Sequence, residues 1–235
     1  MMLDWTPRTF QWFEAADAWT GYSKKLARLL WERVRVPGTL LDMGCGMAFP
    51  DFALAPHVGE ITCVDRDERV IAYVQEKIKS ESISNLRALS ANGEEVQGQW
   101  DTVMCIFHGE KETILSSYLP LARDTLLVVV HASRAGNIAP EGYKVRKCSG
   151  VQETSDFFRQ QGISFELLET GIEFGQPLTS LQEAQDFIRA YSRKDIPQEA
   201  VTAELESRLV KTGHHQYPYY LPSVKQFGIY TIRRA

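Results

Sequence analysis

The sequence predicts a three-layer α/β fold built on a doubly wound, mostly parallel sheet. Between residues 35 and 135, short and nearly continuous apolar runs alternate with amphipathic stretches of helical period. Strands of this kind are buried on both faces, which is typical of parallel sheets covered by helices on both sides. Acidic, glycine-containing or polar turns follow several of these runs, at the edge where such sheets bind ligands.

The elements alternate along the chain with short connections. Strands are expected at 39–43, 60–65, 85–91, 101–107, 124–133, 163–177 and 226–234. Helices are expected at 7–19, 21–34, 50–58, 68–80, 109–122, 152–162, 179–192 and 197–213. The helix at 68–80 is the clearest, because Val70, Val74 and Ile78 recur every fourth residue on one face.

Composition narrows the functional classes. The 235 residues carry a formal net charge of -4, so a general nucleic-acid binder is disfavoured, because such proteins usually carry a basic surplus. No apolar run reaches the length of a membrane span, and the first residues lack the pattern of a secretory signal. The four cysteines show no metal-ligand spacing. We therefore expect a cytoplasmic globular protein with no membrane partner.

The turn after the first strand carries the most specific motif. Residues 40–52 read LLDMGCGMAFPDF, in which Asp42 precedes Gly44, Gly46 and Ala48 at intervals of two. A dinucleotide fingerprint would require a small residue where Phe49 stands. An acid placed before the glycines would also repel a pyrophosphate. It suits S-adenosylmethionine (SAM), which carries an ammonium and a sulfonium and no phosphate.

A second acid follows at the end of the next strand. Asp65 closes the segment ITCVD and can accept hydrogen bonds from both hydroxyls of a ribose. Together, LLDMGCGMAFPDFA, ITCVDRD, ALSANGEEV and QWDTVMCIF resemble the motifs of class I SAM-dependent methyltransferases, over roughly residues 35–135. This resemblance implies a Rossmann-like sheet of seven strands whose last strand is antiparallel.

The resemblance also implies a set of cofactor contacts. The backbone at Gly44, Cys45 and Gly46 would meet the methionine part, Asp65 the ribose, and Arg66 the adenine. Ala91 and Asn92 stand where the family often has an acid facing the adenine amino group, and Asn92 offers a neutral amide oxygen instead. The full predicted set is Asp42, Gly44, Cys45, Gly46, Asp65, Arg66, Ala91, Asn92, Cys105 and Phe107, with Trp19 and Tyr22 from the N-terminal helices.

The end of the fourth strand bears on the chemistry. The sequence CIFHGE stands where base-methylating relatives often carry Asn/Asp-Pro-Pro-aromatic, which counts against methylation of nucleic-acid bases. His108 would lie at the crevice and could act as a catalytic base toward a hydroxyl, thiol or carboxyl-type acceptor. Alternatively, it only hydrogen-bonds the loop. His131 is a weaker candidate for substrate contact, and Cys105 is not expected to accept a methyl group.

The flanking regions predict the domain organisation. Residues 1–34 form an N-terminal helical cap, 35–177 and 223–235 form the SAM-binding domain, and 178–222 form a two-helix lid between strands six and seven. Ser180 and Glu183 read as a capping box that starts the first lid helix. A lid makes a closed pocket, which suits a small molecule.

The segment after the lid, GHHQYPYYLP, is rich in ring side chains. His214, Tyr217 and Tyr220 are candidates for lining the substrate pocket. Because adjacent residues of an extended segment point to opposite sides, His214 and His215 are not expected to share a metal, and no metal is predicted.

The sequence thus predicts a SAM-dependent methyltransferase that acts on a small molecule by in-line displacement and leaves S-adenosylhomocysteine as product. Three alternatives remain open. The first is an RNA or protein methyltransferase, for which the cluster of Lys144, Arg146 and Lys147 is the only support. The others are a non-catalytic SAM-binding module and, more distantly, a nicotinamide dehydrogenase. The acceptor is not predicted, and a monomer and a homodimer are equally compatible with the sequence.

Overall fold

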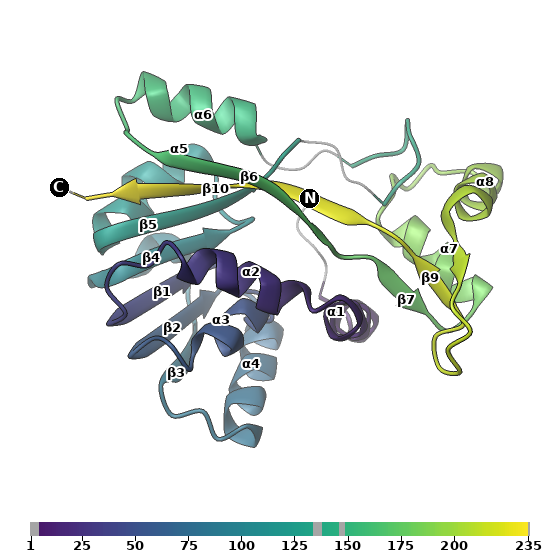
Figure 1. The fold of residues 1–235 in the computed structure, drawn as a ribbon, viewed down its shortest axis with the longest axis horizontal. Coiled ribbons are helices and arrows are strands. Elements are labelled where there is room, and N and C mark those ends of the chain that lie inside the picture. Colours follow the sequence, from purple (N-terminus) through teal and green to yellow (C-terminus); the bar gives the residue numbers. More distant parts are fainter. Residues whose placement is uncertain (1–4, 134–137, 146–148, 235) are drawn as a thin grey trace. The chain divides into compact units, whose positions relative to one another are not determined.

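The computed structural model describes residues 5–133, 138–145 and 149–234 (Figure 1). The chain divides into two compact units. We call residues 23–132, 148–170 and 227–235 the large-sheet unit, and residues 1–22, 133–147 and 171–226 the small-sheet unit. Of the predicted basic cluster, Arg146 and Lys147 lie outside the described residues, and the Lys144 ammonium contacts the Glu141 carboxylate at 2.6 Å.

The large sheet has seven strands in the order β3-β2-β1-β4-β5-β10-β6 (Figure 1). Their bounds are β1 Thr39–Met43, β2 Glu60–Asp65, β3 Leu86–Ser90, β4 Trp100–Ile106, β5 Ala122–His131, β6 Glu166–Glu173 and β10 Val224–Arg233. β1 lies parallel between β2 and β4, with Asp42 opposite Cys63 and Met104. β10 runs antiparallel to β5, pairing Phe227 with His131. The predicted doubly wound sheet with an antiparallel last strand is confirmed.

The central strands β1, β2, β4 and β5 follow the predicted ones closely because most of their residues are buried. Leu40, Leu41, Val103 and Leu127 are at most 1% exposed, as expected for strands covered on both faces. The strand predicted at 163–177 instead divides into β6, most of whose residues are exposed or half-buried, and a separate strand at Gln176–Leu178. The flanking helices are α2 Tyr22–Trp31, α3 Phe49–Leu54, α4 Glu68–Ser80 and α6 Val151–Gln160. α3 ends earlier than the predicted 50–58, shortly before Pro56.

The predicted helix at 109–122 is irregular in the structure. It consists of α5 Lys111–Thr113, a π turn at Ile114–Tyr118 and a 3-10 turn at Leu119–Leu121. Pro120 has no backbone N–H, and the 3-10 turn leads directly into β5. The π turn carries Tyr118, whose side chain is buried with Ile114 and Leu121 in the core.

The small-sheet unit contains a sheet that the sequence did not predict. Its strands, β7 Gln176–Leu178, β8 Val210–Lys211 and β9 Tyr219–Leu221, have the order β7-β9-β8. The unit also holds α1 Pro7–Thr20, α7 Leu181–Ala190 and α8 Gln198–Arg208. The predicted helix at 197–213 was therefore too long, because the backbone becomes extended at Leu209 and Val210–Lys211 pairs with Tyr219–Tyr220.

The helix starts in this unit agree with the sequence. The Ser180 hydroxyl accepts a hydrogen bond from the Glu183 N–H and so caps α7, as predicted. The second half of the predicted capping box is absent, because the Glu183 carboxylate accepts hydrogen bonds from Thr179 and the Trp12 indole and not from the Ser180 N–H. Among the described helices, none is both long and apolar enough to cross a bilayer.

Candidate functional site

The turn after β1 is held in a left-handed conformation by its glycines. Gly44, Gly46 and Ala48 have φ angles of 73°, 53° and 53°. The amide groups of Gly44 and Cys45 both donate to the Val64 carbonyl, at 2.7 and 3.0 Å. Glycine has no Cβ atom, so Gly44 and Gly46 adopt this conformation without steric strain, whereas Ala48 adopts it at a cost in free energy. The turn is therefore anchored to the end of β2 and presents its backbone to the carboxyl edge of the sheet.

Asp65 links that turn to the start of α4. Its Oδ2 accepts a hydrogen bond from the Gly46 N–H at 3.0 Å, and its Oδ1 accepts one from the Asp67 N–H, also at 3.0 Å. Each carboxylate oxygen can accept a further bond, and the side chain is half-buried. Asp65 can therefore hold the turn and still accept hydrogen bonds from a ligand.

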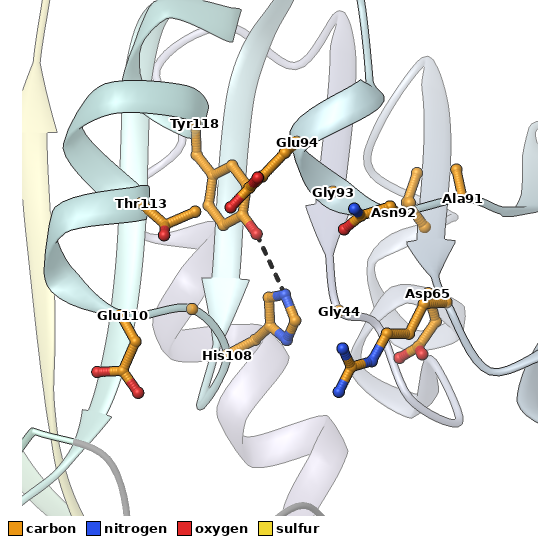
Figure 2. A pocket seen from close by; sticks show the side chains of 13 residues that line it. Gly44, Asp65, Ala91, Asn92, Gly93, Glu94, His108, Glu110, Thr113 and Tyr118 are labelled. Atoms are coloured by element: carbon orange, nitrogen blue, oxygen red, sulfur yellow. Dashed lines mark hydrogen bonds between the residues drawn. The ribbon is translucent and has the colours of Figure 1, made fainter.

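A pocket opens where four strand ends meet (Figure 2). It lies at the carboxyl ends of β1 to β4 and encloses about 640 Å³ of space, part of it open to solvent. Its lining is Gly44, Val64, Asp65, Arg66, Ala91, Asn92, Gly93, Glu94, His108, Gly109, Glu110, Thr113 and Tyr118. The structure thus gathers six predicted residues at one site: Gly44, Asp65, Arg66, Ala91, Asn92 and His108.

His108 projects into this pocket beside Tyr118. The Tyr118 hydroxyl lies 3.3 Å from the His108 Nε2, and the two rings are stacked with an interplanar angle of 15° (Figure 2). Burial lowers the pKa of His108, while Asp65 raises it and Arg66 lowers it. Burial also raises the pKa of Tyr118 to about 12. At neutral pH the pair therefore consists of an uncharged imidazole and a protonated phenol.

Asp42 lies beneath the glycine turn and does not line the pocket. It is 1% exposed and adjoins Asp51 of α3, which is fully buried. Apart from contacts within the cluster of Asp42, Asp51 and Cys63, no described side chain supplies a donor to their carboxyl oxygens. Burial, reinforced by Asp51, raises the pKa of Asp42 well above its usual range, and burial raises the pKa of Asp51 to about 7. The two carboxyl groups must therefore share a proton, because two adjacent buried charges are too costly.

Four further predicted residues of the large-sheet unit do not line the pocket. The Cys45 thiol is buried and donates to the Gly46 carbonyl at 3.5 Å. Cys105 is fully buried within the core, and burial raises the pKa of its thiol. Phe107 has a φ of 55° and stacks on His131, with ring centroids 4.3 Å apart. His131 therefore packs against Phe107 and does not line the pocket.

Three of the predicted residues of the small-sheet unit contact a fourth, Trp19. Trp19 stacks on Tyr220 with centroids 5.8 Å apart, and meets His214 and Tyr217 edge-on. Tyr22 is 2% exposed and lies against Phe174, with centroids 4.5 Å apart. Because these rings belong to a separate unit, their predicted roles toward cofactor and substrate stay predictions.

Sequence reasoning missed several lining residues. These are Val64, Gly93, Glu94, Gly109, Glu110, Thr113 and Tyr118. Gly93 and Glu94 directly follow the predicted Asn92, and Gly109 and Glu110 follow His108, so a wider window at each strand end would have included them. Tyr118 had no such signal, because the π turn that directs it into the pocket leaves no pattern in the sequence.

Comparison with known families matches part of the chain. Residues 30–115 match the family model described as tellurite resistance protein TehB. That segment includes the glycine turn, Asp65 and His108, and it covers less than half of the chain. No curated protein sequence matches the chain significantly.

Solved structures match over nearly the whole chain at low identity. The YcgJ protein from Bacillus subtilis shares 14% identity with a TM-score of 0.58, covering 92% of this chain and 99% of its own. Magnesium protoporphyrin IX methyltransferase from Synechocystis, solved with bound SAM, shares 14% identity with a TM-score of 0.53, covering 92% and 79%. Geranyl diphosphate methyltransferase in complex with SAM shares 12% with a TM-score of 0.54, covering 90% and 85%. At such identities the likeness shows a shared fold.

Proposed function

We propose that this chain, which has the class I SAM-dependent methyltransferase fold, binds SAM in the pocket at the ends of β1 to β4 and transfers its methyl group to a small molecule. Methyl transfer needs little beyond alignment, because the sulfonium is already a good leaving group. The protein's contribution is to hold the cofactor, to align a nucleophile with its methyl carbon and to exclude water.

The observation that carries the proposal is the convergence of the glycine turn and Asp65 on one pocket. The turn offers close backbone approach at Gly44, and Asp65 keeps unused acceptor capacity at a position suited to a ribose. Neither feature alone names a cofactor. Together they support the SAM site that the sequence motif implies, because they lie at the carboxyl edge where this class of sheet binds ligands.

The charge of the pocket favours SAM over a dinucleotide. Three carboxylate side chains line it, Asp65, Glu94 and Glu110, against one guanidinium, Arg66. A negatively charged lining attracts a sulfonium and an ammonium and repels a pyrophosphate. SAM carries a net positive charge, whereas oxidised nicotinamide dinucleotide carries two phosphates.

The proposed roles follow the lining. The backbone of the turn would meet the methionine part, Asp65 the ribose, and Ala91 and Asn92 the adenine, with Arg66 beside it. The acceptor would then approach from the side of the segment after β4, where Glu110, Thr113 and Tyr118 supply polar groups. Asp42 would act from beneath the turn, through its proton-sharing contact with Asp51.

A small-molecule acceptor is supported by two of the similar solved structures, which are methyltransferases of magnesium protoporphyrin IX and of geranyl diphosphate, both small molecules. We further propose that residues 178–222 close over the acceptor as a lid and that the enzyme works in the cytoplasm.

Calorimetric titration tests the cofactor directly. We expect SAM and S-adenosylhomocysteine to bind the full chain with micromolar affinity, and oxidised nicotinamide dinucleotide not to bind. Binding of the dinucleotide, without either sulfur cofactor, would overturn the proposal.

Asp65→Ala sharpens that titration. Loss of the acceptors for Gly46, Asp67 and the ribose should weaken S-adenosylhomocysteine by roughly 100-fold, equivalent to about 3 kcal/mol. Asp67→Ala is the matched control, because this neighbouring carboxylate caps α4 and pairs with Arg69 without lining the pocket. Equal losses in both variants would remove Asp65 from the cofactor site.

The acceptor can be sought by its product. Incubation of the protein with SAM and pools of small alcohols, thiols, amines and carboxylic acids should release S-adenosylhomocysteine, detected by mass spectrometry, in at least one pool. Tight SAM binding without turnover in any pool, and turnover on RNA or on protein instead, would each contradict the small-molecule assignment.

A further inference from the structure

Two carboxyl groups are buried next to each other beneath the glycine turn. Asp42, in β1, is 1% exposed, and Asp51, in the first turn of α3, is 0% exposed. Their side chains are hydrogen-bonded to each other. Such a bond needs a proton on at least one of the two groups, because carboxylates only accept. The pair therefore holds one or two protons.

The groups that face this pair from the neighbouring elements are thiols and one further carboxylate. They are Cys45 in the turn, Cys63 in β2, Cys105 in β4, and Asp65 at the end of β2. Burial raises the pKa of Cys63 and of Cys105, so these thiols stay protonated at neutral pH. Among the described residues, no Lys, Arg or His side chain donates to either carboxyl of the pair. The pair therefore has no cation in contact to offset a negative charge.

The titration of the pair falls near neutral pH. Burial raises the pKa of Asp51 to about 7, and burial together with Asp51 raises the pKa of Asp42 well above its usual range. Because the two groups are in contact, the protons leave the pair in steps. The first step gives a pair with one proton and one negative charge. The second step is suppressed, since it would leave two adjacent buried charges.

A charge in the pocket acts on this pair. Asp65 lines the pocket together with Gly44, which follows Asp42 by two residues (Figure 2). After the larger effects of burial and of Asp51, the Asp65 carboxylate also raises the pKa of Asp42. The field of a negative charge at the pocket lining thus reaches the pair. A positive charge beside Asp65 must act in the opposite sense and favour loss of a proton from the pair.

We propose that the buried pair of Asp42 and Asp51 determines cofactor specificity, because it gives up one proton when SAM occupies the pocket and thereby favours SAM over S-adenosylhomocysteine. The proton passes to the solvent. Asp42 then carries the negative charge beneath the turn, and Asp51 keeps the remaining proton and donates it to Asp42 in a hydrogen bond. S-adenosylhomocysteine lacks the sulfonium charge, so it favours the anionic pair less. The identity of the ligand rests on the proposed function, whereas the titration of the pair does not.

Calorimetry on the wild-type protein tests the proton release. Titration at pH 7 in two buffers of different ionisation enthalpy gives the number of protons exchanged on binding. We expect SAM to release roughly 0.4 of a proton and S-adenosylhomocysteine to release much less. Because the anionic pair is favoured as pH rises, SAM should also bind roughly 4-fold tighter at pH 7.5 than at pH 6, with a smaller change for S-adenosylhomocysteine. Equal proton release by the two ligands would overturn the proposal.

A double variant assigns the proton to the pair. Asp42→Asn with Asp51→Asn removes both titrating groups and keeps the shape of both side chains. SAM should then release no more protons than S-adenosylhomocysteine, and its preference over S-adenosylhomocysteine at pH 7.5 should fall by roughly 5-fold. Any titration of the ligands themselves is common to both proteins and cancels. Wild-type proton release in this variant would contradict the assignment.

Two single variants are the controls. Glu94→Gln removes an exposed carboxylate of the pocket lining, and His108→Gln removes the imidazole that lines the same pocket. Both should keep the difference in proton release between SAM and S-adenosylhomocysteine. Loss of that difference in His108→Gln would assign the proton to the imidazole and overturn the proposal.

The outcomes separate this inference from the proposed function. If the wild-type protein binds neither ligand, the proposed function fails, and carboxyl-carbon NMR of the ligand-free protein still decides whether the pair titrates near neutral pH. If both ligands bind with equal proton release, SAM binding stands and the specificity role of the pair is wrong. Thermal unfolding of each variant checks that the fold is retained, and the wild-type comparison decides the proton release even where a variant fails to fold.

Discussion

The two units of this chain use their polar and aromatic side chains in opposite ways. In the large-sheet unit, polar groups gather around a pocket with capacity left unused, as at Asp65 and His108. In the small-sheet unit, the rings of Tyr217 and Tyr220 both contact the ring of Trp19. The large-sheet unit therefore keeps polar groups available to a ligand, whereas the rings of the small-sheet unit have partners within that unit.

This difference shows how residue type alone can mislead. His214 and Tyr217 suggest a binding site in the sequence, yet mutual packing is a sufficient reason for their aromatic character. Packing does not explain the burial of Asp42 and Asp51, because burying two adjacent carboxyl groups costs free energy. Side chains whose burial costs free energy of folding are the better guide to function, and in this chain they are Asp42 and Asp51, next to the glycine turn.

The largest effect that the comparison predicts is on the stability of the small-sheet unit. Trp12 is 4% exposed, meets Phe187 edge-on with centroids 5.1 Å apart, and donates from Nε1 to Glu183 at 3.0 Å. Trp12→Ala should lower the free energy of unfolding by about 3–5 kcal/mol, as for a large ring removed from a core. Denaturant unfolding gives the magnitude, and hydrogen exchange in α7 shows whether the loss is local.

Trp12→Phe separates the ring from its donor. The Glu183 carboxylate still accepts hydrogen bonds from the Thr179 N–H and hydroxyl, both at 2.6 Å, so this variant should lose only about 1 kcal/mol. Similar losses in both variants would mean that the hydrogen bond, and not ring packing, dominates this unit.

The next effect contrasts one glycine from each unit. Gly44 and Gly213 have nearly equal φ angles, 73° and 76°, but a Cβ at Gly44 meets the His108 ring whereas one at Gly213 meets nothing within 4 Å. Gly213→Ala should cost about 1 kcal/mol from backbone strain alone. Gly44→Ala should cost about 2–3 kcal/mol and weaken S-adenosylhomocysteine at least 10-fold, measured by thermal unfolding and calorimetry. Equal costs would show that crowding by His108 is unimportant.

Much of the large sheet could be predicted from the sequence because its signals are local. Leu40 and Leu41 lie in a short apolar run that ends in the glycine turn, and α4 has the bounds that its periodicity predicts. The pocket residues directly at strand ends, such as Asp65 and Asn92, followed from the same logic. Parallel sheets place those ends together whatever their separation along the chain.

The remainder depends on contacts that are distant in sequence. Val210–Lys211 becomes a strand only because Tyr219–Tyr220 pairs with it, and a two-residue strand leaves no periodic pattern. Tyr118 reaches the pocket through a π turn, which has no sequence signature. The pairing of Asp42 with Asp51 brings a strand and a helix together, and in the sequence Asp51 reads as an ordinary first-turn acid.

A smaller effect concerns the buried carboxyl pair and depends on pH. Burial raises the pKa of Asp51 in the folded state to about 7. Protonation of Asp51 therefore stabilises the fold fully at pH values below the pKa of the unfolded chain, and this contribution is lost as pH rises through about 7. Asp51→Asn keeps an uncharged side chain at every pH. Its stability relative to wild type should therefore grow from pH 5 to pH 8.5, by about 1–2 kcal/mol.

Thermal unfolding across that pH range, with Asp195→Asn as control, measures this growth. Asp195 is an exposed carboxylate of the small-sheet unit paired with Arg193, so its replacement should give a small difference that does not grow with pH. A pH-independent effect of Asp51→Asn would show that the pair holds no shared proton.

The smallest effect tests whether the rings of the small-sheet unit only pack. Trp19 is 39% exposed and stacks on Tyr220, so a double-mutant cycle with Trp19→Ala and Tyr220→Ala should give a coupling of about 0.5–1 kcal/mol. The pair of Trp19 and Phe187, which packs on Trp12 instead, should give a coupling near zero. Once an acceptor is known, Trp19→Ala separates the two roles. A packing role lowers stability and leaves KM for the acceptor unchanged, whereas a rise in KM at unchanged stability would return Trp19 to the substrate site that the sequence predicts.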